Sequence, residues 1–240
     1  MTRTFLLDGR TIPFAEGQTV MDAAIAAGVY IPHLCHHPDF KPQGSCRLCT
    51  VEIDGRTTSA CTLPARDGLV VKSETDELNA ARRTITRFLF VEGNHTCPSC
   101  EKSGSCTLQA VAYHLDVEEP KYPHFHPRRA VDASHPDVFL DRDRCIYCEL
   151  CVRASRDVDG KSVFGLAGRG IATHLVVNSP SGLLVDSTLE ATDRAVDVCP
   201  VGAILPKRKG FVDPIGERRY DLGDVSVLGE RRVGHEEGER

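Results

Sequence analysis

The spacing of the cysteines constrains this chain more than any other feature. The 240 residues contain eleven cysteines, which fall into three groups. The first group reads Cys-x10-Cys-x2-Cys-x11-Cys, the second Cys-x2-Cys-x5-Cys, and the third Cys-x2-Cys-x2-Cys with one more cysteine far downstream. Thiolates are soft ligands for iron–sulfur clusters, zinc or copper(I), and a Cys-x2-Cys loop can place two sulfurs on one centre. The pattern therefore predicts small modules, each partly held together by a metal cofactor.

A count of ligands suggests three centres. The three groups contain four, three and four cysteines. If each centre takes four ligands, the second group therefore lacks one ligand that is not a cysteine. His95 stands two residues before Cys97 and can fill that position, with His114 in reserve; His36 and His37 are expected to be bystanders. The expected ligands are Cys35, Cys46, Cys49 and Cys61 in the first site, His95, Cys97, Cys100 and Cys106 in the second site, and Cys145, Cys148, Cys151 and Cys199 in the third site.

Charge and hydropathy limit the environment of the chain. A formal net charge of -5 argues against nucleic acid as the main partner. No apolar run approaches the roughly 20 residues that a membrane-spanning helix needs, and the apolar patch 5–7 is too short for a signal peptide. Without export, grouped cysteines are expected to be reduced metal ligands rather than disulfides. These patterns predict a cytoplasmic protein with no membrane span.

The first module is expected to cover residues 1–74. Asp8-Gly9 and Asp54-Gly55 lie between apolar and β-branched runs and predict two hairpins. A helix from Val20 to Ala27 follows Thr19, a capping residue. The cysteine spacing differs from the Cys-x4-Cys-x2-Cys of plant-type ferredoxins, but the plan is similar. Zinc, the alternative, normally uses two short Cys-x2-4-Cys loops, and only one exists here. A β-grasp module with a [2Fe–2S] cluster is the prediction.

The second module is expected over residues 75–117. Its apolar periodicity predicts a helix from Asp76 to Val91, and a shorter helix should run from Thr107 to about Leu115. Three cysteines and a histidine would suit zinc as well as a [4Fe–4S] cluster. Residues 118–136, with four prolines, are expected to form an extended linker.

The third module is expected over residues 137–220, before a charged tail at 221–240. Strands are predicted at 138–140, 163–166 and 174–177, and a helix from about Ser187 to Val198 should deliver Cys199.

The third cysteine group resembles half of a two-cluster ferredoxin. Such ferredoxins repeat Cys-x2-Cys-x2-Cys-x3-Cys-Pro, and each fourth cysteine binds the other cluster. Here Ser155-Arg156 stands where the first Cys-Pro would fall, and the second copy keeps only Cys199-Pro200. Because the two losses match, one [4Fe–4S] site is expected to remain.

Motifs for other chemistry are missing from the sequence. Residues 165–170 have the wrong order of glycines for a dinucleotide loop, and neither a Gly-x4-Gly-Lys loop nor a nucleophile–base pair stands out. An α+β chain of three small iron–sulfur modules, without a substrate pocket, is predicted to pass single electrons between active sites on other chains.

The order of the modules resembles known redox proteins. The order of a two-iron domain, a His/Cys3 domain and a ferredoxin-like domain resembles the N-terminal part of the large iron–sulfur subunit of respiratory complex I. It also resembles the N-terminal half of long [FeFe]-hydrogenases. Over essentially the whole chain, the resemblance is to small diaphorase subunits of cytoplasmic NAD-reducing [NiFe]-hydrogenases. The stretches that carry it are Ile31-Pro32-x-Leu34-Cys35, the run from Gly93 to Gly104, and Asp213-Pro214-Ile215-Gly216. The spacing His95-x-Cys97 is shorter than the usual His-x3-Cys. From the resemblance we expect a separate subunit without the further domains of those larger proteins.

The resemblance implies cofactors and partners. Family members bind one [2Fe–2S] and two [4Fe–4S] clusters and lie between a flavin- and NAD-binding subunit and the small and large [NiFe]-hydrogenase subunits. FMN, NAD and the [NiFe] centre would belong to those partners. Electrons from hydrogen would enter at the third site, with the two [4Fe–4S] clusters on the main path and the [2Fe–2S] cluster beside it. The alternatives are the equivalent subunit of a NAD-dependent formate dehydrogenase or electron-bifurcating complex, and a zinc-binding scaffold protein.

Overall fold

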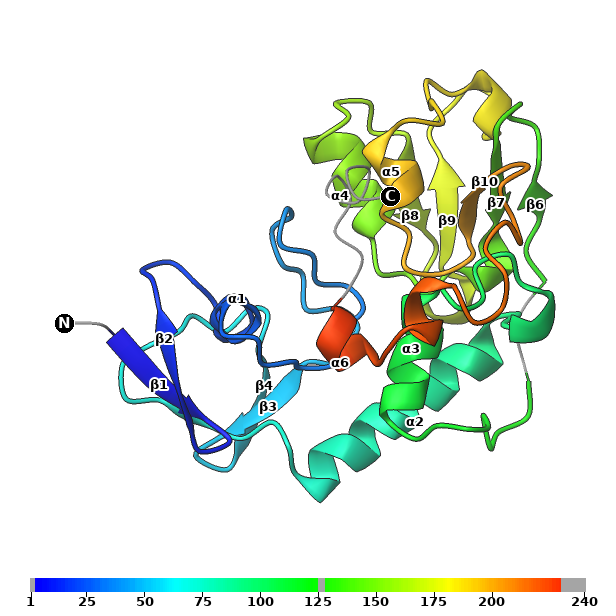
Figure 1. The fold of residues 1–240 in the computed structure, drawn as a ribbon. Coiled ribbons are helices and arrows are strands. Elements are labelled where there is room, and N and C mark those ends of the chain that lie inside the picture. The colour runs from blue at the N-terminus through cyan, green and yellow to red at the C-terminus, as the bar shows by residue number, and fades with distance from the viewer. Residues whose placement is uncertain (1–2, 125–127, 230–240) are drawn as a thin grey trace.

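The computed structural model describes residues 3–124 and 128–229 and has an α+β fold with several small sheets. Figure 1 shows two lobes. The N-terminal strands form the smaller lobe, and a long helix, α2 (Asp76–Glu92), runs from it beneath the larger lobe.

The smaller lobe contains the two predicted hairpins. Strands β1 (Arg3–Leu7) and β2 (Arg10–Phe14) pair antiparallel, and β5 (Val70–Val71) adds to β1 in parallel. Strands β3 (Thr50–Ile53) and β4 (Arg56–Ser59) form the second hairpin. Both Asp-Gly turns have positive φ at their two central residues, as a tight hairpin turn requires.

Helix α1 (Val20–Ala26) packs its apolar face into the smaller lobe. Its N-terminus has a capping box, in which the Thr19 hydroxyl accepts from the Asp22 N–H at 3.1 Å and the Asp22 carboxylate accepts from the Thr19 N–H at 2.9 Å. The core below it is formed by apolar residues such as Phe5, Leu7 and Met21, all at most 1% exposed. The predicted helix is therefore confirmed.

The rest of the chain forms the larger lobe around short elements. They are, in order, η1 (Cys97–Ser99), α3 (Thr107–His114), β6 (Val131–Asp132), β7 (Val138–Asp141), η2 (Arg142–Arg144), α4 (Leu150–Asp157), β8 (Phe164–Ala167), η3 (Gly170–Ala172), β9 (His174–Val177), η4 (Leu184–Asp186), α5 (Arg194–Asp197), β10 (Ile204–Pro206), η5 (Arg219–Asp221) and α6 (Val225–Leu228). The expected pairing of 163–166 with 174–177 is confirmed by the β8–β9 ladder. Strand β6 lies within the stretch 118–136 and pairs with β7, which also pairs with β10.

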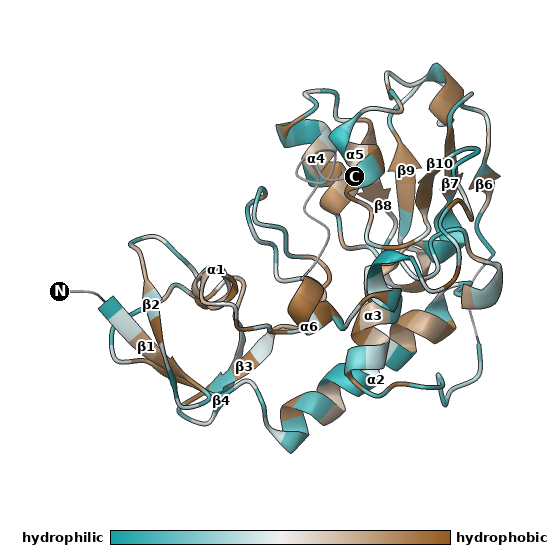
Figure 2. Ribbon diagram, in the orientation of Figure 1, coloured by the Kyte–Doolittle hydropathy of each residue, from teal (hydrophilic) through white to brown (hydrophobic). Residues whose placement is uncertain are grey.

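One apolar core extends through the larger lobe and into the smaller one. It joins residues of α3, α4 and the sheets, and it includes Leu34, Cys35 and Leu48 from the loops between α1 and β3. Figure 2 shows that strands β8, β9 and β10, which contribute residues to this core, consist mostly of hydrophobic residues. The shared core fixes the loop of the first site against the larger lobe.

The helix expected from Ser187 to Val198 is wrong over most of its length. Only Arg194–Asp197 is helical. Upstream, side chains bind the backbone locally: Glu190 N–H donates to Asp193 Oδ2 at 2.8 Å, and Leu189 N–H donates to Ser187 Oγ at 3.3 Å. Such bonds compete with helix formation. Asp159 then accepts from the N–H groups of Arg194 and Ala195 and starts α5.

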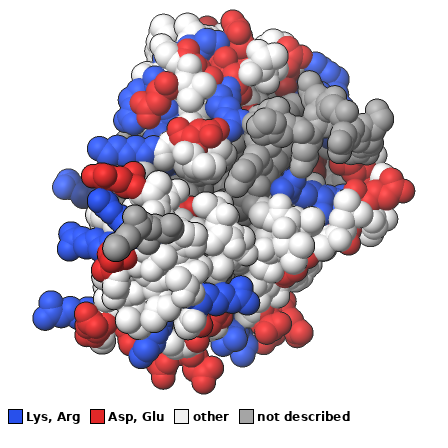
Figure 3. Space-filling view, turned by 60° about the vertical axis from the view of Figure 1, so that its left-hand side comes forward, with Lys and Arg blue, Asp and Glu red and all other residues white. Residues whose placement is uncertain are grey.

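Charges are mixed over the surface. On the face in Figure 3, basic and acidic side chains of the described residues are interspersed along the left and lower edges, with uncharged residues between them. Among the residues that the structure describes, no helix is both long and apolar enough to cross a membrane.

Candidate metal centres

The structure brings the four cysteines of the first site together. Cys35 lies in the loop after α1, Cys46 and Cys49 precede β3, and Cys61 follows β4. Cys35, Cys49 and Cys61 are 0% exposed, and Cys46 is partly exposed. One hairpin and one long loop therefore enclose this site.

The sulfurs of the first site form two close pairs. Cys46 N–H donates to Cys35 Sγ at 3.4 Å, and the Sγ atoms of Cys49 and Cys61 lie 3.3 Å apart, well beyond the roughly 2.05 Å of a disulfide. The Cys46 thiol lowers the pKa of Cys35 to about 5, and the Cys61 thiol lowers the pKa of Cys49 to about 7. Two such pairs suit two irons that each take two thiolates.

The second site is a short loop between α2 and α3. Cys97 opens η1, the Cys100 N–H donates to the Cys97 carbonyl at 3.1 Å, and Cys106 is the N-cap of α3. Burial raises the pKa of Cys106 to about 12, and the nearby Cys100 and Cys97 add to that rise. The structure thus groups the three cysteines of this site.

His95 follows the end of α2. Its ring packs against Phe90, with centroids 5.6 Å apart, and a Cβ placed on Gly93 would lie 2.5 Å from its Nε2. The Cys97 thiol donates to the His95 carbonyl at 3.9 Å. The role of His95 as the fourth ligand stays a prediction.

The other histidines near the sites have different contacts. His114, the reserve ligand, lies on α3 with its Nδ1 2.9 Å from the Asp224 carboxylate. His36 is 1% exposed, and its Nε2 is 3.6 Å from Asp22 Oδ1. His37 Nδ1 accepts from the Asp39 N–H at 3.2 Å.

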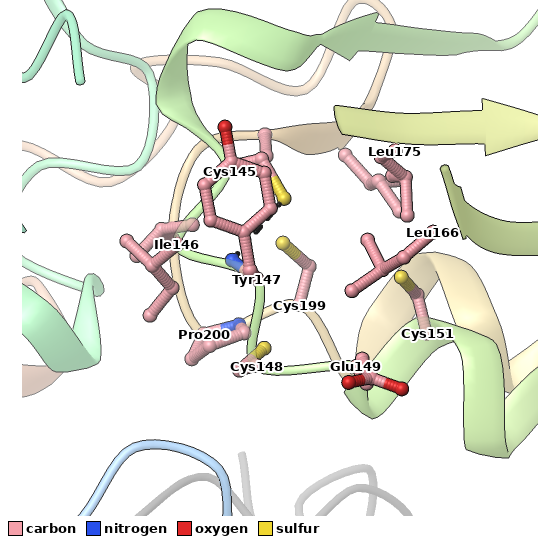
Figure 4. Close-up of a pocket in the computed structure, with 13 residues that line it drawn as sticks. Cys145, Ile146, Tyr147, Cys148, Glu149, Cys151, Leu166, Leu175, Cys199 and Pro200 are labelled. Carbon is pink, nitrogen blue, oxygen red and sulfur yellow. Dashed lines mark hydrogen bonds between the residues drawn. The ribbon is translucent and has the colours of Figure 1, made fainter. Parts of the chain in front are cut away.

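The third site is a pocket with sulfur on several sides. Cys145 and Cys148 lie in the loop before α4, Cys151 in its first turn, and Cys199 after α5 (Figure 4). All four line one pocket, together with apolar side chains that include Ile146, Leu166, Leu175 and Val201.

The loop of the third site is tightly curved. Tyr147 and Glu149 adopt left-handed φ values of 53° and 57°, a conformation uncommon outside glycine. The turn directs the Tyr147 N–H to Cys145 Sγ at 3.5 Å. Helix α4 begins only at Leu150, so Cys145 and Cys148 precede the helix and Cys151 lies in its first turn.

Burial disfavours free thiolates in the third site. It raises the pKa of Cys145 to about 12, and the pKa values of Cys148 and Cys151 lie well above the ordinary range for the same reason. A buried thiolate needs a compensating cation, and iron in a cluster replaces the thiol proton and supplies that charge. The donor set and its apolar surroundings fit a [4Fe–4S] cluster. Within 3–124 and 128–229, no three Cys, His, Asp or Glu side chains are arranged to hold a single metal ion.

The second and third sites share a wall, the loop from Cys199 to Gly202. A Cβ on Gly202 would lie 2.8 Å from Cys100 Sγ, and the Pro200 carbonyl accepts from the Thr107 N–H at 2.9 Å. Arg144, next to Cys145, donates to Cys100 Sγ at 3.8 Å.

The first and third sites are joined by Arg153 on α4. Its guanidinium donates to the Cys35 carbonyl at 2.6 Å and to the Cys148 carbonyl at 3.1 Å. The cysteine spacing did not predict that Arg144 and Arg153 contact the sites. Arg144 contacts Cys100 and Arg153 contacts Cys35, and both cysteines lie far from these arginines in the sequence.

Three stretches match models of iron–sulfur families. Residues 2–76 match a 2Fe-2S iron-sulfur cluster binding domain. Residues 82–121 match the NADH-ubiquinone oxidoreductase-G iron-sulfur binding region, and residues 138–205 match a 4Fe-4S single cluster domain. Each stretch contains the cysteines of one site.

The similarity to individual proteins extends further. The chain is 41% identical over 226 residues to the gamma chain of the NAD-reducing hydrogenase HoxS of Cupriavidus necator, covering 94% of this chain and 96% of the relative. It is 32% identical to the mitochondrial NADH-ubiquinone oxidoreductase 78 kDa subunit of Candida albicans, but spans only 28% of that protein's length. A chain in the crystal structure of a NAD+-reducing [NiFe]-hydrogenase in the H2-reduced state superposes with a TM-score of 0.92 at 52% identity, covering 95% of this chain and 97% of that one. The chain therefore belongs to the family of gamma chains of NAD-reducing hydrogenases.

Proposed function

We propose that this chain relays electrons within a NAD-reducing hydrogenase, with a [2Fe–2S] cluster at the first site and [4Fe–4S] clusters at the second and third sites. The first and third sites would use the four cysteines of each group, and the second would use His95, Cys97, Cys100 and Cys106. When bound, the clusters supply single-electron transfer. The protein around them excludes water and donates hydrogen bonds that set their potentials.

The observation that carries the proposal is the direct contact between the sites. Arg153 donates hydrogen bonds to the carbonyls of Cys35 and Cys148, and Gly202, three residues after Cys199, lies directly against Cys100 Sγ. These contacts favour a line of sites in the order first, third, second. The order differs from the one expected from the sequence, in which the [2Fe–2S] cluster lay beside the path and the third site received the electrons.

The proposed partners follow from the relatives. One relative is a chain of a NAD-reducing hydrogenase, and another is a chain in the structure of a NAD+-reducing [NiFe]-hydrogenase. In the proposal, a flavin- and NAD-binding subunit contacts one end of the line, and the small and large [NiFe]-hydrogenase subunits contact the other. FMN, NAD and the [NiFe] centre belong to these partners. The cytoplasmic location rests on eleven cysteines that are all free thiols here.

The proposed modules are 1–74, 75–117 and 137–220. Residues 118–136 connect the second and third modules and include β6, and residues 221–240 follow the third module.

Anaerobic purification of this chain with its native partners tests the proposal. We expect a brown complex that contains nickel and reduces NAD+ with hydrogen, and EPR signals from one two-iron and two four-iron clusters. A colourless zinc protein would contradict the relay. A brown complex without nickel that reduced NAD+ only from formate would keep the relay but contradict the hydrogenase.

A further inference from the structure

Arg153 is a buried arginine that lies between two sites. It is 4% exposed, and its guanidinium makes four hydrogen bonds. Nη2 donates to the Cys35 carbonyl at 2.6 Å and to the Cys148 carbonyl at 3.1 Å, Nη1 donates to the Lys41 carbonyl at 2.9 Å, and Nε donates to the Glu149 carbonyl at 3.3 Å. One side chain therefore holds the cysteine loops of the first and third sites together.

The acceptors of Arg153 are unusual for a buried cation. A guanidinium keeps its positive charge in proteins, and a buried charge is normally paired with an opposite one. In the part of the chain that the structure describes, the hydrogen-bond acceptors of Arg153 are all backbone carbonyls and none is a carboxylate. The Phe40 ring lies 5.9 Å from the guanidinium carbon and adds a modest cation–π contact.

Arg144 provides the contrast. Its guanidinium lies 3.8 Å from the Cys100 sulfur, but it pairs with Glu101 at 2.7 Å and with Asp141 at 2.9 Å. The charge of Arg144 is therefore largely balanced by acids, whereas among the described residues Arg153 forms no ion pair and interacts with the exposed Asp157 carboxylate only at longer range. A cluster bound by four thiolates is negative, and each electron that it accepts makes it more negative. Clusters on both sides of Arg153 would supply the missing opposite charge.

We propose that Arg153 is a positioning residue shared by the first and third sites, which fixes their two cysteine loops against each other and whose charge favours reduction of both clusters. This inference rests on the proposed cluster assignments. The charge lowers the free energy of the reduced state of each cluster, so its removal makes both clusters harder to reduce.

The test compares three variants in the intact complex by EPR-monitored redox titration. Arg153→Gln removes the charge but keeps an N–H donor for the loops, and Arg153→Lys keeps the charge. Arg156→Gln is the matched control, since Arg156 lies on the same helix, is exposed and forms its ion pair with Asp157. In Arg153→Gln we expect the reduced-to-oxidised ratio of the first and third clusters to fall about tenfold at a fixed potential, which is a shift of about 59 mV for one electron. The second cluster should keep its potential, and Arg153→Lys and Arg156→Gln should titrate like the parent protein.

Several results would overturn the inference. Parental potentials in Arg153→Gln would show that the charge is not felt by the clusters. An equal decrease at all three clusters would indicate a general change of structure. If Arg153→Gln lost its clusters, the Arg153→Lys variant would test the role of the charge. Lowered reduction potentials of the first and third clusters in that variant, which keeps the charge, would contradict that role. Absence of cluster signals from the parent protein would instead contradict the proposed function.

Discussion

At the scale of single residues, the three sites differ in what surrounds their sulfurs. In the first site, the thiol of one cysteine in each pair donates to the sulfur of the other and lowers its pKa. In the second site, Cys100 contacts a guanidinium that two carboxylates balance. In the third site, the sulfurs line an apolar pocket. Because hydrogen bonds and charge near the sulfurs tune cluster potentials, the three sites are expected to have different potentials.

Gly202 gives the first prediction. Its missing side chain leaves room for Cys100 Sγ, because a Cβ there would lie 2.8 Å from that sulfur. Gly202→Ala should displace Cys100 and lower the occupancy of the second cluster several-fold, measured by EPR and iron content. Gly165→Ala is the control, since its Cβ would meet the nearest atom at an ordinary 3.5 Å. Equal cluster content in the two variants would contradict the close contact.

The residues that lie at each site could be predicted only partly from the sequence. The cysteine groups were evident from short spacings and from the ligand count. Arg153 and Arg144 were not, because each acts on a loop brought near by tertiary folding, and a single sequence gives no sign of which arginines are buried.

At the scale of elements, local signals predicted the structure where the chain makes local contacts. The Asp-Gly turns and the Thr19 capping box form as expected. The helix predicted from Ser187 failed because its start is decided by distant residues. Asp159 caps α5, and Lys161 Nζ donates to Asp193 Oδ1 at 2.7 Å.

Asp159 therefore gives a prediction for α5. Its carboxylate accepts from the Arg194 and Ala195 N–H groups at 2.9 and 3.1 Å, and this helix leads directly to Cys199. Asp159→Ala should cost about 1 kcal/mol, as for other lost caps, and lower the midpoint of thermal unfolding by about 2–4 °C. The measurement is anaerobic thermal unfolding followed by the visible absorbance of the clusters.

Asp159→Asn is an intermediate variant, because its single amide oxygen can replace only one of the two carboxylate oxygens that accept the hydrogen bonds. Its unfolding midpoint should lie between those of Asp159→Ala and the parent protein. An Asp159→Ala protein with the parental midpoint would mean that the cap does not stabilise α5.

At the scale of the whole molecule, the packing of the modules against one another could not be predicted from the sequence. Three modules in chain order were expected, but one core includes Cys35, Cys106 and Cys199 from all three cysteine groups. The smaller lobe keeps a second core of its own around β1, β2 and α1. Contacts between residues so far apart in sequence leave no local pattern in the chain.

The two cores predict different responses to removal of iron. The core of the smaller lobe is mainly apolar side chains, so β1 and β2 should stay protected from hydrogen exchange after chelation. A bound cluster holds the four buried sulfurs of the third site together, so residues 145–151 and 199–206 should exchange at least tenfold faster after its removal. Hydrogen exchange with mass spectrometry before and after anaerobic chelation measures both. Uniform acceleration in the two lobes would contradict two separate cores.

The most direct measurement of the relay is the activity of a Cys46→Ala variant in the complete complex. If the three sites lie in line, loss of the first cluster should lower the rate of hydrogen-dependent NAD+ reduction at least a hundredfold. Hydrogen-dependent reduction of a viologen and NADH-dependent reduction of a dye should persist, which shows that the partner subunits are assembled and active. Parental hydrogen-dependent NAD+ reduction in a complex that lacks the two-iron signal would place the first site beside the path and contradict the proposed line.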